Sequence, residues 1–162
     1  QILYNVPGRT AVDMSVDTTS RLSEISNIIG IKDATGDLSV IKELVAKCPE
    51  DFLLLTGDDA TAIDFLLLGG HGGISVTANV TPKELQKAYL AAIAGNTELA
   101  KKLNEGLSGL HKNLFIESNP IPVKWALHKM GKCDNGIRLP LLELSNECKT
   151  VLENDLKELN LI

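Results

Sequence analysis

Long apolar runs, clustered positive charge and low-complexity tracts are all absent from this chain of 162 residues. No apolar stretch approaches the roughly 20 residues needed to cross a bilayer, so we expect no membrane partner. The 16 Lys and Arg residues form no run and the formal net charge is −5, which argues against a nucleic-acid-binding protein. With 44% hydrophobic and 23% charged residues, the composition is that of one globular domain with a sizeable core.

Paired cysteines are also absent, because Cys48, Cys133 and Cys148 are odd in number and widely spaced. Neither a disulfide framework nor a zinc site has that pattern, so we expect no metal and predict a reduced, cytoplasmic setting. The chain lacks an initiator Met and a signal peptide and opens directly in an apolar, strand-like run, QILYNVP. This beginning predicts a cut through the middle of a domain.

Four short apolar runs recur in the first half of the chain, and each is followed by a segment with helical spacing. Strands that are apolar on both faces and alternate with helices are typical of βα units in a parallel sheet. The predicted strands are QILYN (1–5), NIIGIK (27–32), FLLLTG (52–57) and GGISVT (72–77). The helical segments after the first three cover residues 16–25, 37–48 and 58–70.

The pattern changes after the fourth predicted strand, because only amphipathic helices follow. The first begins at Thr81, with Pro82 at the first helical position, and ends near Gly95. Three more are predicted, over residues 97–115, 121–131 and 145–159. The sequence therefore predicts an α/β part over residues 1–95 and a C-terminal helical extension over residues 96–162. Four parallel strands fit either an open doubly wound sheet or half of an eight-stranded barrel.

Polar or reactive side chains stand at the carboxyl end of every predicted strand. In α/β barrels and open sheets that rim is where ligands bind. Structural needs alone would not place polar groups at four consecutive strand ends, so a functional site is predicted there. The residues are Tyr4, Asn5, Lys32, Asp33, Thr56, Gly57, Asp58, Asp59, Ser75 and Thr77.

Lys32 ends the apolar run NIIGIK, where an ammonium group would be taken out of water. Such a lysine either snorkels out to pair with Asp33 or Asp37, or it serves as a Schiff-base nucleophile. Burial disfavours the ammonium form, so the neutral amine that attacks a carbonyl becomes populated near neutral pH. The strand by itself leaves both interpretations open.

Five segments carry a family resemblance: YNVPGRT (4–10), IGIKDATGD (29–37), TGDDAT (56–61), GGISVTANV (72–80) and NPIPVKWAL (119–127). Together they resemble the dihydrodipicolinate synthase family, and the resemblance runs over essentially the whole chain. That family belongs to the pyruvate-dependent class I aldolase superfamily, with N-acetylneuraminate lyase, and its fold is a (β/α)8 TIM barrel with a C-terminal helical domain. The resemblance implies strands five to eight of the barrel and the helical extension, without the first four βα units.

The resemblance also implies roles for single residues. Lys32 matches the lysine that forms a covalent imine with pyruvate, without a further cofactor. Tyr4 matches the tyrosine that relays protons to and from the imine intermediates. Arg9 matches the arginine that grips the carboxylate of the second substrate, which a guanidinium fork suits. Gly57 and Ile74 match positions whose backbone faces the bound pyruvate, and a glycine lets the chain come close.

The implied activity is that of a lyase-type synthase, which condenses pyruvate with L-aspartate 4-semialdehyde on the diaminopimelate and lysine route. Two alternatives stay open: another pyruvate-dependent class I aldolase, and an inactive scaffold or interaction fragment. Arg9 favours the synthase, because the neuraminate lyases carry no arginine at its position. Other site residues of the family come from a Gly-Thr-Thr region of an early strand and from a neighbouring subunit. Neither is in this chain, so we expect the chain alone to be inactive.

A homo-oligomer is implied as well, namely a tetramer built as a dimer of dimers. Asp64, Leu67 and Leu68 lie at helical spacing, and a tetramer in the family uses matching positions at its weaker interface. The alternative is that the leucines are ordinary core residues. The expected partners are further copies of the chain, the N-terminal half of the same protein and the two substrates. Without that half, strands 1–5 and 72–77 would be unpaired edges.

Four other polar residues receive simpler interpretations. Asp58 and Asp59 open a helix, and at least one of them is expected to cap it. Their charge argues against a phosphate site at the rim. The glycines of GGHGG (69–73) precede a strand instead of opening a helix, so His71 is interpreted as a structural residue on the opposite face. His111 is interpreted as an amphipathic-helix residue without ligand geometry.

Overall fold

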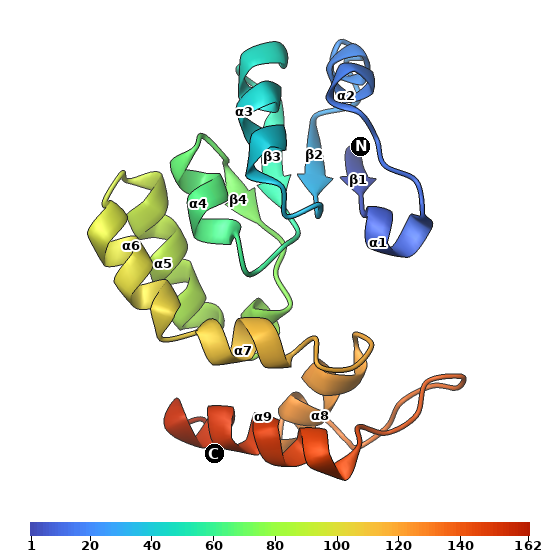
Figure 1. The fold of residues 1–162 in the computed structure, drawn as a ribbon, viewed down its shortest axis with the longest axis vertical. Coiled ribbons are helices and arrows are strands. Elements are labelled where there is room, and N and C mark those ends of the chain that lie inside the picture. The colour runs from blue at the N-terminus through green and yellow to red at the C-terminus, as the bar shows by residue number, and fades with distance from the viewer.

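A computed structural model describes all residues from 1 to 162 and contains one four-stranded parallel sheet (Figure 1). The strands pair in chain order, and each of the three neighbouring pairs is parallel. This confirms the predicted α/β fold with four βα units and a parallel sheet. The strands are β1 (Ile2–Asn5), β2 (Gly30–Asp33), β3 (Leu53–Thr56) and β4 (Gly72–Gly73).

Helices separate the strands, as the periodicity predicts. α1 (Pro7–Thr10) and α2 (Val16–Ser23) lie between β1 and β2, α3 (Leu38–Lys47) follows β2, and α4 (Ala62–Leu67) follows β3. Short polar side chains start two of them by accepting a backbone N–H: Ser15 bonds to Thr18 N before α2, and Asp37 bonds to Ser39 N before α3. The four-residue helix α1 begins with Pro7 at its first position and carries Arg9.

The second half of the chain is helical, and none of its helices is long and apolar enough to span a membrane. Helices α7, α8 and α9 lie beyond the carboxyl ends of the strands, while α5 and α6 pack beside α4 (Figure 1). The predicted helix over 97–115 is broken near Gly106 into two. The elements are η1 (Thr77–Asn79), α5 (Pro82–Ile93), α6 (Thr97–Glu105), α7 (Ser108–Asn113), α8 (Ile121–Lys129) and α9 (Asn146–Glu158).

The prediction of a strand over residues 72–77 is wrong beyond Gly73. The amide of Ile74 still donates to Thr56 O at 2.9 Å, but the chain then leaves the sheet and turns into η1. Two causes are visible. β4 is an edge strand, so no second neighbour holds its outer side, and the backbone of Val76 and Thr77 bonds instead to the carboxylate of Asp59.

Apolar side chains gather in three clusters. The sheet cluster lies between the strands and their helices, the middle cluster joins α4 to α5 and α6, and the C-terminal cluster lies among α7, α8 and α9. The boundary predicted between residues 95 and 96 falls inside the middle cluster, since Ala100 of α6 packs there with Ile63 of α4. The division into a barrel part and an extension stays a prediction.

The two faces of the sheet differ, because alternate residues of a strand point to opposite faces. Leu3, Ile31 and Leu54 share one row and pack in the sheet cluster. The other face, called the open face below, keeps large side chains in water. It carries Ile2, Tyr4, Lys32, Leu53 and Leu55. β1 and β4 are the two edges of the sheet, as the barrel interpretation predicts for this chain.

Candidate active site

The parallel register brings the polar strand ends together in one row. Asn5 pairs with Asp33, Asp33 pairs with Thr56, and Thr56 pairs with Gly73. One residue earlier along the strands, Tyr4 pairs with Lys32. The predicted rim of polar side chains is therefore a continuous feature of the fold.

Lys32 and Tyr4 are in direct contact on the open face. The Lys32 Nζ atom lies 4.0 Å from the centroid of the Tyr4 ring, a distance at which the ring face attracts a cation. Lys32 forms no ion pair with Asp33 or Asp37, because Asp33 bonds to neighbouring side chains and Asp37 caps α3. Snorkelling to those carboxylates therefore does not explain the lysine. The expected dry site is not formed by this chain alone, since Lys32 is half-buried and Tyr4 is 47% exposed.

Gly57 lies against the side chain of Lys32. A Cβ atom at position 57 would stand 2.6 Å from Lys32 Cε and 3.0 Å from the Cβ of Ala34. The Gly57 amide also donates to Asp33 O at 2.6 Å. With any other residue at position 57 the lysine side chain would have to move from its present place, so the glycine permits this close approach. The structure thus brings Tyr4, Lys32 and Gly57 together, while the chemical roles assigned to them stay predictions.

Arg9 and Ile74 lie at the same rim without touching the lysine. Arg9 is exposed on the one-turn helix α1, and Ile74 is 51% exposed directly after β4. No hydrogen bond or ion pair joins either residue to Tyr4 or Lys32. In this chain they border the site from two sides, and their roles toward substrates also stay predictions.

A buried polar network lies beside Lys32 and centres on Asn5. The Nδ2 of Asn5 donates to Asp13 Oδ1 at 2.8 Å and to Asp33 Oδ1 at 3.1 Å, and its Oδ1 accepts the amide of Met14 at 3.1 Å. The other carboxylate oxygen of Asp33 accepts the hydroxyl and the amide of Thr35. Sequence reasoning placed Asn5 and Asp33 at the rim but missed Asp13. The sequence of the loop over residues 6–14 contains no pattern that shows which of its polar side chains will hydrogen-bond to Asn5.

The two aspartates after Gly57 have separate tasks. Asp58 Oδ2 accepts the amide and hydroxyl of Thr61 at 3.0 and 2.8 Å, so it closes the turn that leads into α4. The expectation that one of the pair caps the helix itself is wrong, because the N-cap residue of α4 is Thr61, without a side-chain cap bond. Asp59 is buried. Its Oδ2 accepts the amides of Val76 and Thr77 at 3.1 and 3.0 Å and the hydroxyl of Thr77 at 3.1 Å. This carboxylate therefore joins the end of β3 to the segment after β4.

His111 extends that connection into the C-terminal helices. Its Nδ1 lies 2.9 Å from Thr77 Oγ1 and its Nε2 lies 3.0 Å from Asn104 Oδ1. Burial lowers the pKa of His111, against the opposing negative charges of Asp59 and Asp58. His111 is a helix residue, as interpreted from the sequence, and the structure adds that it is a buried link between α7 and the rim.

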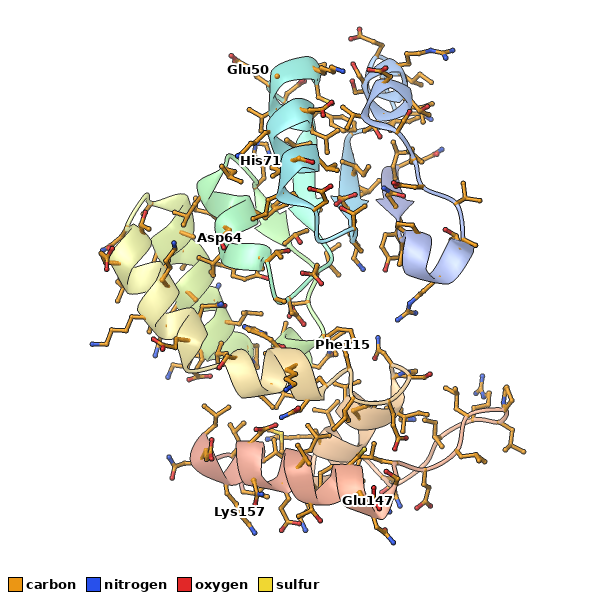
Figure 2. The ribbon with its side chains drawn as sticks, in the orientation of Figure 1. Glu50, Asp64, His71, Phe115, Glu147 and Lys157 are labelled. Carbon is orange, nitrogen blue, oxygen red and sulfur yellow. The ribbon has the colours of Figure 1, made fainter.

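Two further polar side chains, His71 and Tyr89, lie near the ends of the strands. His71 lies beside α3 and α4, away from the C-terminal helices (Figure 2), and its Nδ1 accepts the amide of Leu54 at 3.0 Å. That bond fits the structural role predicted for it. The Tyr89 hydroxyl is buried near the rim, where burial and then the charges of Asp59 and Asp58 raise the pKa of Tyr89 well above its usual value.

Comparison with known proteins decides the family. Residues 1–159 match the sequence profile of the Dihydrodipicolinate synthetase family. The chain belongs to this family. It is 62% identical over 162 residues to the 4-hydroxy-tetrahydrodipicolinate synthase of Ruthia magnifica subsp. Calyptogena magnifica, covering 100% of this chain and 55% of that protein. Identity to the synthase of Laribacter hongkongensis is 58% over 161 residues, covering 99% of this chain and 55% of that protein.

Solved structures of dihydrodipicolinate synthases share the fold. The chloride-inhibited enzyme from Acinetobacter baumannii, crystallised with pyruvate, superposes with a TM-score of 0.96 at 53% identity, covering 99% of this chain and 55% of that one. The enzyme from Aquifex aeolicus gives a TM-score of 0.96 at 42% identity, covering 99% of this chain and 55% of that one. The chain thus spans about half the length of the synthases it matches, and it corresponds to their C-terminal part. The family resemblance read from the five segments is confirmed.

Proposed function

We propose that this chain is the C-terminal half of a synthase that condenses pyruvate with L-aspartate 4-semialdehyde in lysine and diaminopimelate biosynthesis. In this proposal β1 to β4 are strands five to eight of a TIM barrel, and the later helices are its extension. Family membership supports the reaction class. The observation that carries the assignment of the site is Lys32, whose amine lies over the Tyr4 ring and whose side chain packs on Gly57.

The chemistry follows from the position of the amine. The neutral Nζ of Lys32 attacks the keto carbon of pyruvate, a C–N bond forms, and the former carbonyl oxygen leaves as water to give the imine. The Tyr4 hydroxyl supplies the proton for that water and takes protons back in later steps. Loss of a proton from the pyruvate methyl group then gives the carbon nucleophile that attacks the aldehyde. Arg9 holds the carboxylate of the aldehyde substrate through a charge-assisted pair.

The open face shows what the half-chain lacks for this reaction. Water reaches Lys32 and Tyr4 from that side, so the desolvation that favours a neutral amine is incomplete. We infer that the remainder of the barrel covers the open face and supplies the other site residues. The same observation favours the second candidate, an inactive interaction fragment, for the chain when it stands alone.

A homo-oligomer is also part of the proposal. Asp64 is exposed on α4 (Figure 2) and pairs with Lys101 of α6 at 3.7 Å. Leu67 packs on the middle cluster and Leu68 packs on the sheet cluster, so both leucines have core contacts within one chain. One similar structure, at 39% identity, is described as a monomeric synthase variant. Assembly is therefore a property to be measured and not one that follows from family membership.

The deciding experiment uses what we call the complemented enzyme: this chain joined behind the part of the Ruthia magnifica synthase that precedes the match. Incubation with pyruvate and borohydride should reduce the imine and leave a pyruvate-derived group on the peptide that holds Lys32. Replacing the lysine, Lys32→Ala, should abolish this labelling and lower turnover by at least about 10³-fold. The control Lys42→Ala removes an exposed lysine of α3 and should change neither quantity.

Labelling at a lysine other than Lys32 would refute the assignment. Turnover without any borohydride trapping would refute the imine mechanism. The chain expressed alone should show no turnover, and full turnover by the isolated chain would argue against the half-barrel interpretation.

A further inference from the structure

One side chain closes the loop that carries Arg9. The loop leaves β1 at Val6 and returns at Met14, and Asn5 stands at its start. The amide group of Asn5 captures the return end twice, through Asp13 Oδ1 at 2.8 Å and through the Met14 amide at 3.1 Å. Compact surface loops are characteristically held by such a closure between their two ends.

The same amide reaches the strand that carries Lys32. The second Nδ2 hydrogen of Asn5 is directed to Asp33 Oδ1 at 3.1 Å, and the backbone carbonyl of Asn5 accepts the amide of Ala34 at 2.9 Å. Asn5 is 4% exposed and Asp33 is 3% exposed. Both donors and the acceptor of this buried side chain are therefore used, and the bond to Asp33 lies where a lost partner is costly.

Little else holds the Arg9 loop in place. Residues 8–13 are exposed and α1 buries none of its residues. The hydrogen bonds made by residues 7–12 stay within residues 6–12. Met14 packs on the sheet cluster, but no residue from 6 to 13 belongs to that cluster, and Val12 is 70% exposed. The direction of the loop relative to the sheet therefore depends on the bonds at its two ends.

We propose that Asn5 and Asp13 form a clamp that positions Arg9 relative to Lys32, and that the clamp acts on the second, carboxylate-bearing substrate only. The backbone of Lys32 is held by pairing with β1 and β3, whether or not the clamp is present. Arg9 has no comparable support. Loss of the clamp therefore disturbs the arginine and leaves the imine-forming lysine in place. The inference rests on the proposed function and assigns Asn5 and Asp13 as positioning residues for it.

Asp13→Ala in the complemented enzyme is the sharpest test, because Asp13 is exposed and its removal leaves the core intact. Asn5→Ala is less suitable, since it would strand the buried carboxylate of Asp33. We expect Asp13→Ala to raise the KM for aspartate 4-semialdehyde by about 3- to 10-fold, while borohydride trapping of pyruvate at Lys32 keeps its wild-type rate. Asp13→Asn retains an acceptor oxygen for Asn5 and should restore most of the loss.

A double variant shows whether the clamp acts through the arginine. If it does, Asp13→Ala should add nothing to the KM of Arg9→Ala, because the positioned group is already absent. The control Asp17→Ala removes an exposed aspartate outside the loop and should change neither KM nor trapping. An unchanged KM, an equal loss of pyruvate trapping, or fully additive effects with Arg9→Ala would each overturn the proposal.

Amide hydrogen exchange separates failure of the clamp from failure of the proposed function. In Asp13→Ala, exchange at Met14 and at Arg9 to Ala11 should accelerate, while exchange within β2 stays unchanged. If the wild-type complemented enzyme traps no pyruvate, the proposed function fails, and unchanged loop exchange would reject the clamp independently. Accelerated exchange with normal KM would retain a loop clamp but reject its link to the substrate.

Discussion

The open face of the sheet and the C-terminal cluster bury apolar residues to very different extents. In the C-terminal cluster, Leu110, Leu114, Leu152 and Leu156 are fully buried among α7, α8 and α9. On the open face, Ile2, Tyr4 and Leu53 keep between 37% and 47% of their surface in water. The core of the C-terminal cluster is therefore closed, whereas the sheet is packed on one side only. The candidate site with Tyr4 and Lys32 lies on the less covered side of the sheet.

The largest effect expected from this comparison is on stability, and it uses two leucines. Leu152→Ala should lower the free energy of unfolding by about 2–5 kcal/mol, because it opens a cavity in a closed core. Leu53→Ala in the same chain should cost less than about 1 kcal/mol, since its side chain is 37% exposed. Urea unfolding of the two variants measures both values.

The same two substitutions in the complemented enzyme test whether the open face is covered there. There Leu53→Ala should become as destabilising as an ordinary core substitution, while the effect of Leu152→Ala stays the same. Equal and small effects of Leu53→Ala in both forms would show that the open face stays uncovered in the longer protein.

Arg9→Ala should have the next largest effect. It tests whether Arg9 binds the second substrate while Lys32 binds pyruvate. Loss of a charge-assisted contact is worth about 1.5–3 kcal/mol, so the KM for aspartate 4-semialdehyde should rise about 10- to 150-fold. Pyruvate trapping at Lys32 should survive, because Arg9 does not touch the lysine. Steady-state kinetics with each substrate varied, together with borohydride trapping, measure both effects. An equal loss for both substrates would contradict the assignment.

The smallest effect concerns pH and the link between the two regions. The pKa of His111 is lowered in the folded chain, so below the usual histidine value of about 6.5 the unfolded chain binds more protons than the folded one. Stability is therefore complete above that pH and declines as the pH falls. Between pH 7.5 and 5.5 His111 should account for at most about 1.4 kcal/mol of the loss.

His111→Gln should flatten this decline, as measured by urea unfolding at a series of pH values. The control His128→Gln changes an exposed histidine of α8 and should leave the slope unaltered. If the free energy of unfolding of His111→Gln fell more steeply with decreasing pH than that of the wild type, the wild-type imidazole would be stabilised in its charged form by Asp59.

Features with a repeating pattern were predictable from the sequence. The order of strands and helices follows from apolar periodicity, and the contact between Tyr4 and Lys32 follows from placing two strand ends in parallel register. Gly57 was singled out by the resemblance, and the structure adds the reason, since a side chain there would collide with Lys32. The fourth strand was predicted too long. Ile74, Val76 and Thr77 are β-branched residues typical of a strand, but β4 is an edge strand and their backbone has no partner on its outer side.

By itself the sequence determined the α/β class, the rim at the strand ends and the family. Only the tertiary structure decided which polar groups meet: Asn5 with Asp13 and Asp33, Asp59 with Thr77, and Thr77 with His111. The physical reason is that periodicity reports how much of a helix or strand is turned toward apolar surroundings. A hydrogen bond between side chains 18 or 34 positions apart leaves no period in the chain. It exists only once the packed backbone has brought its two ends within about 3 Å.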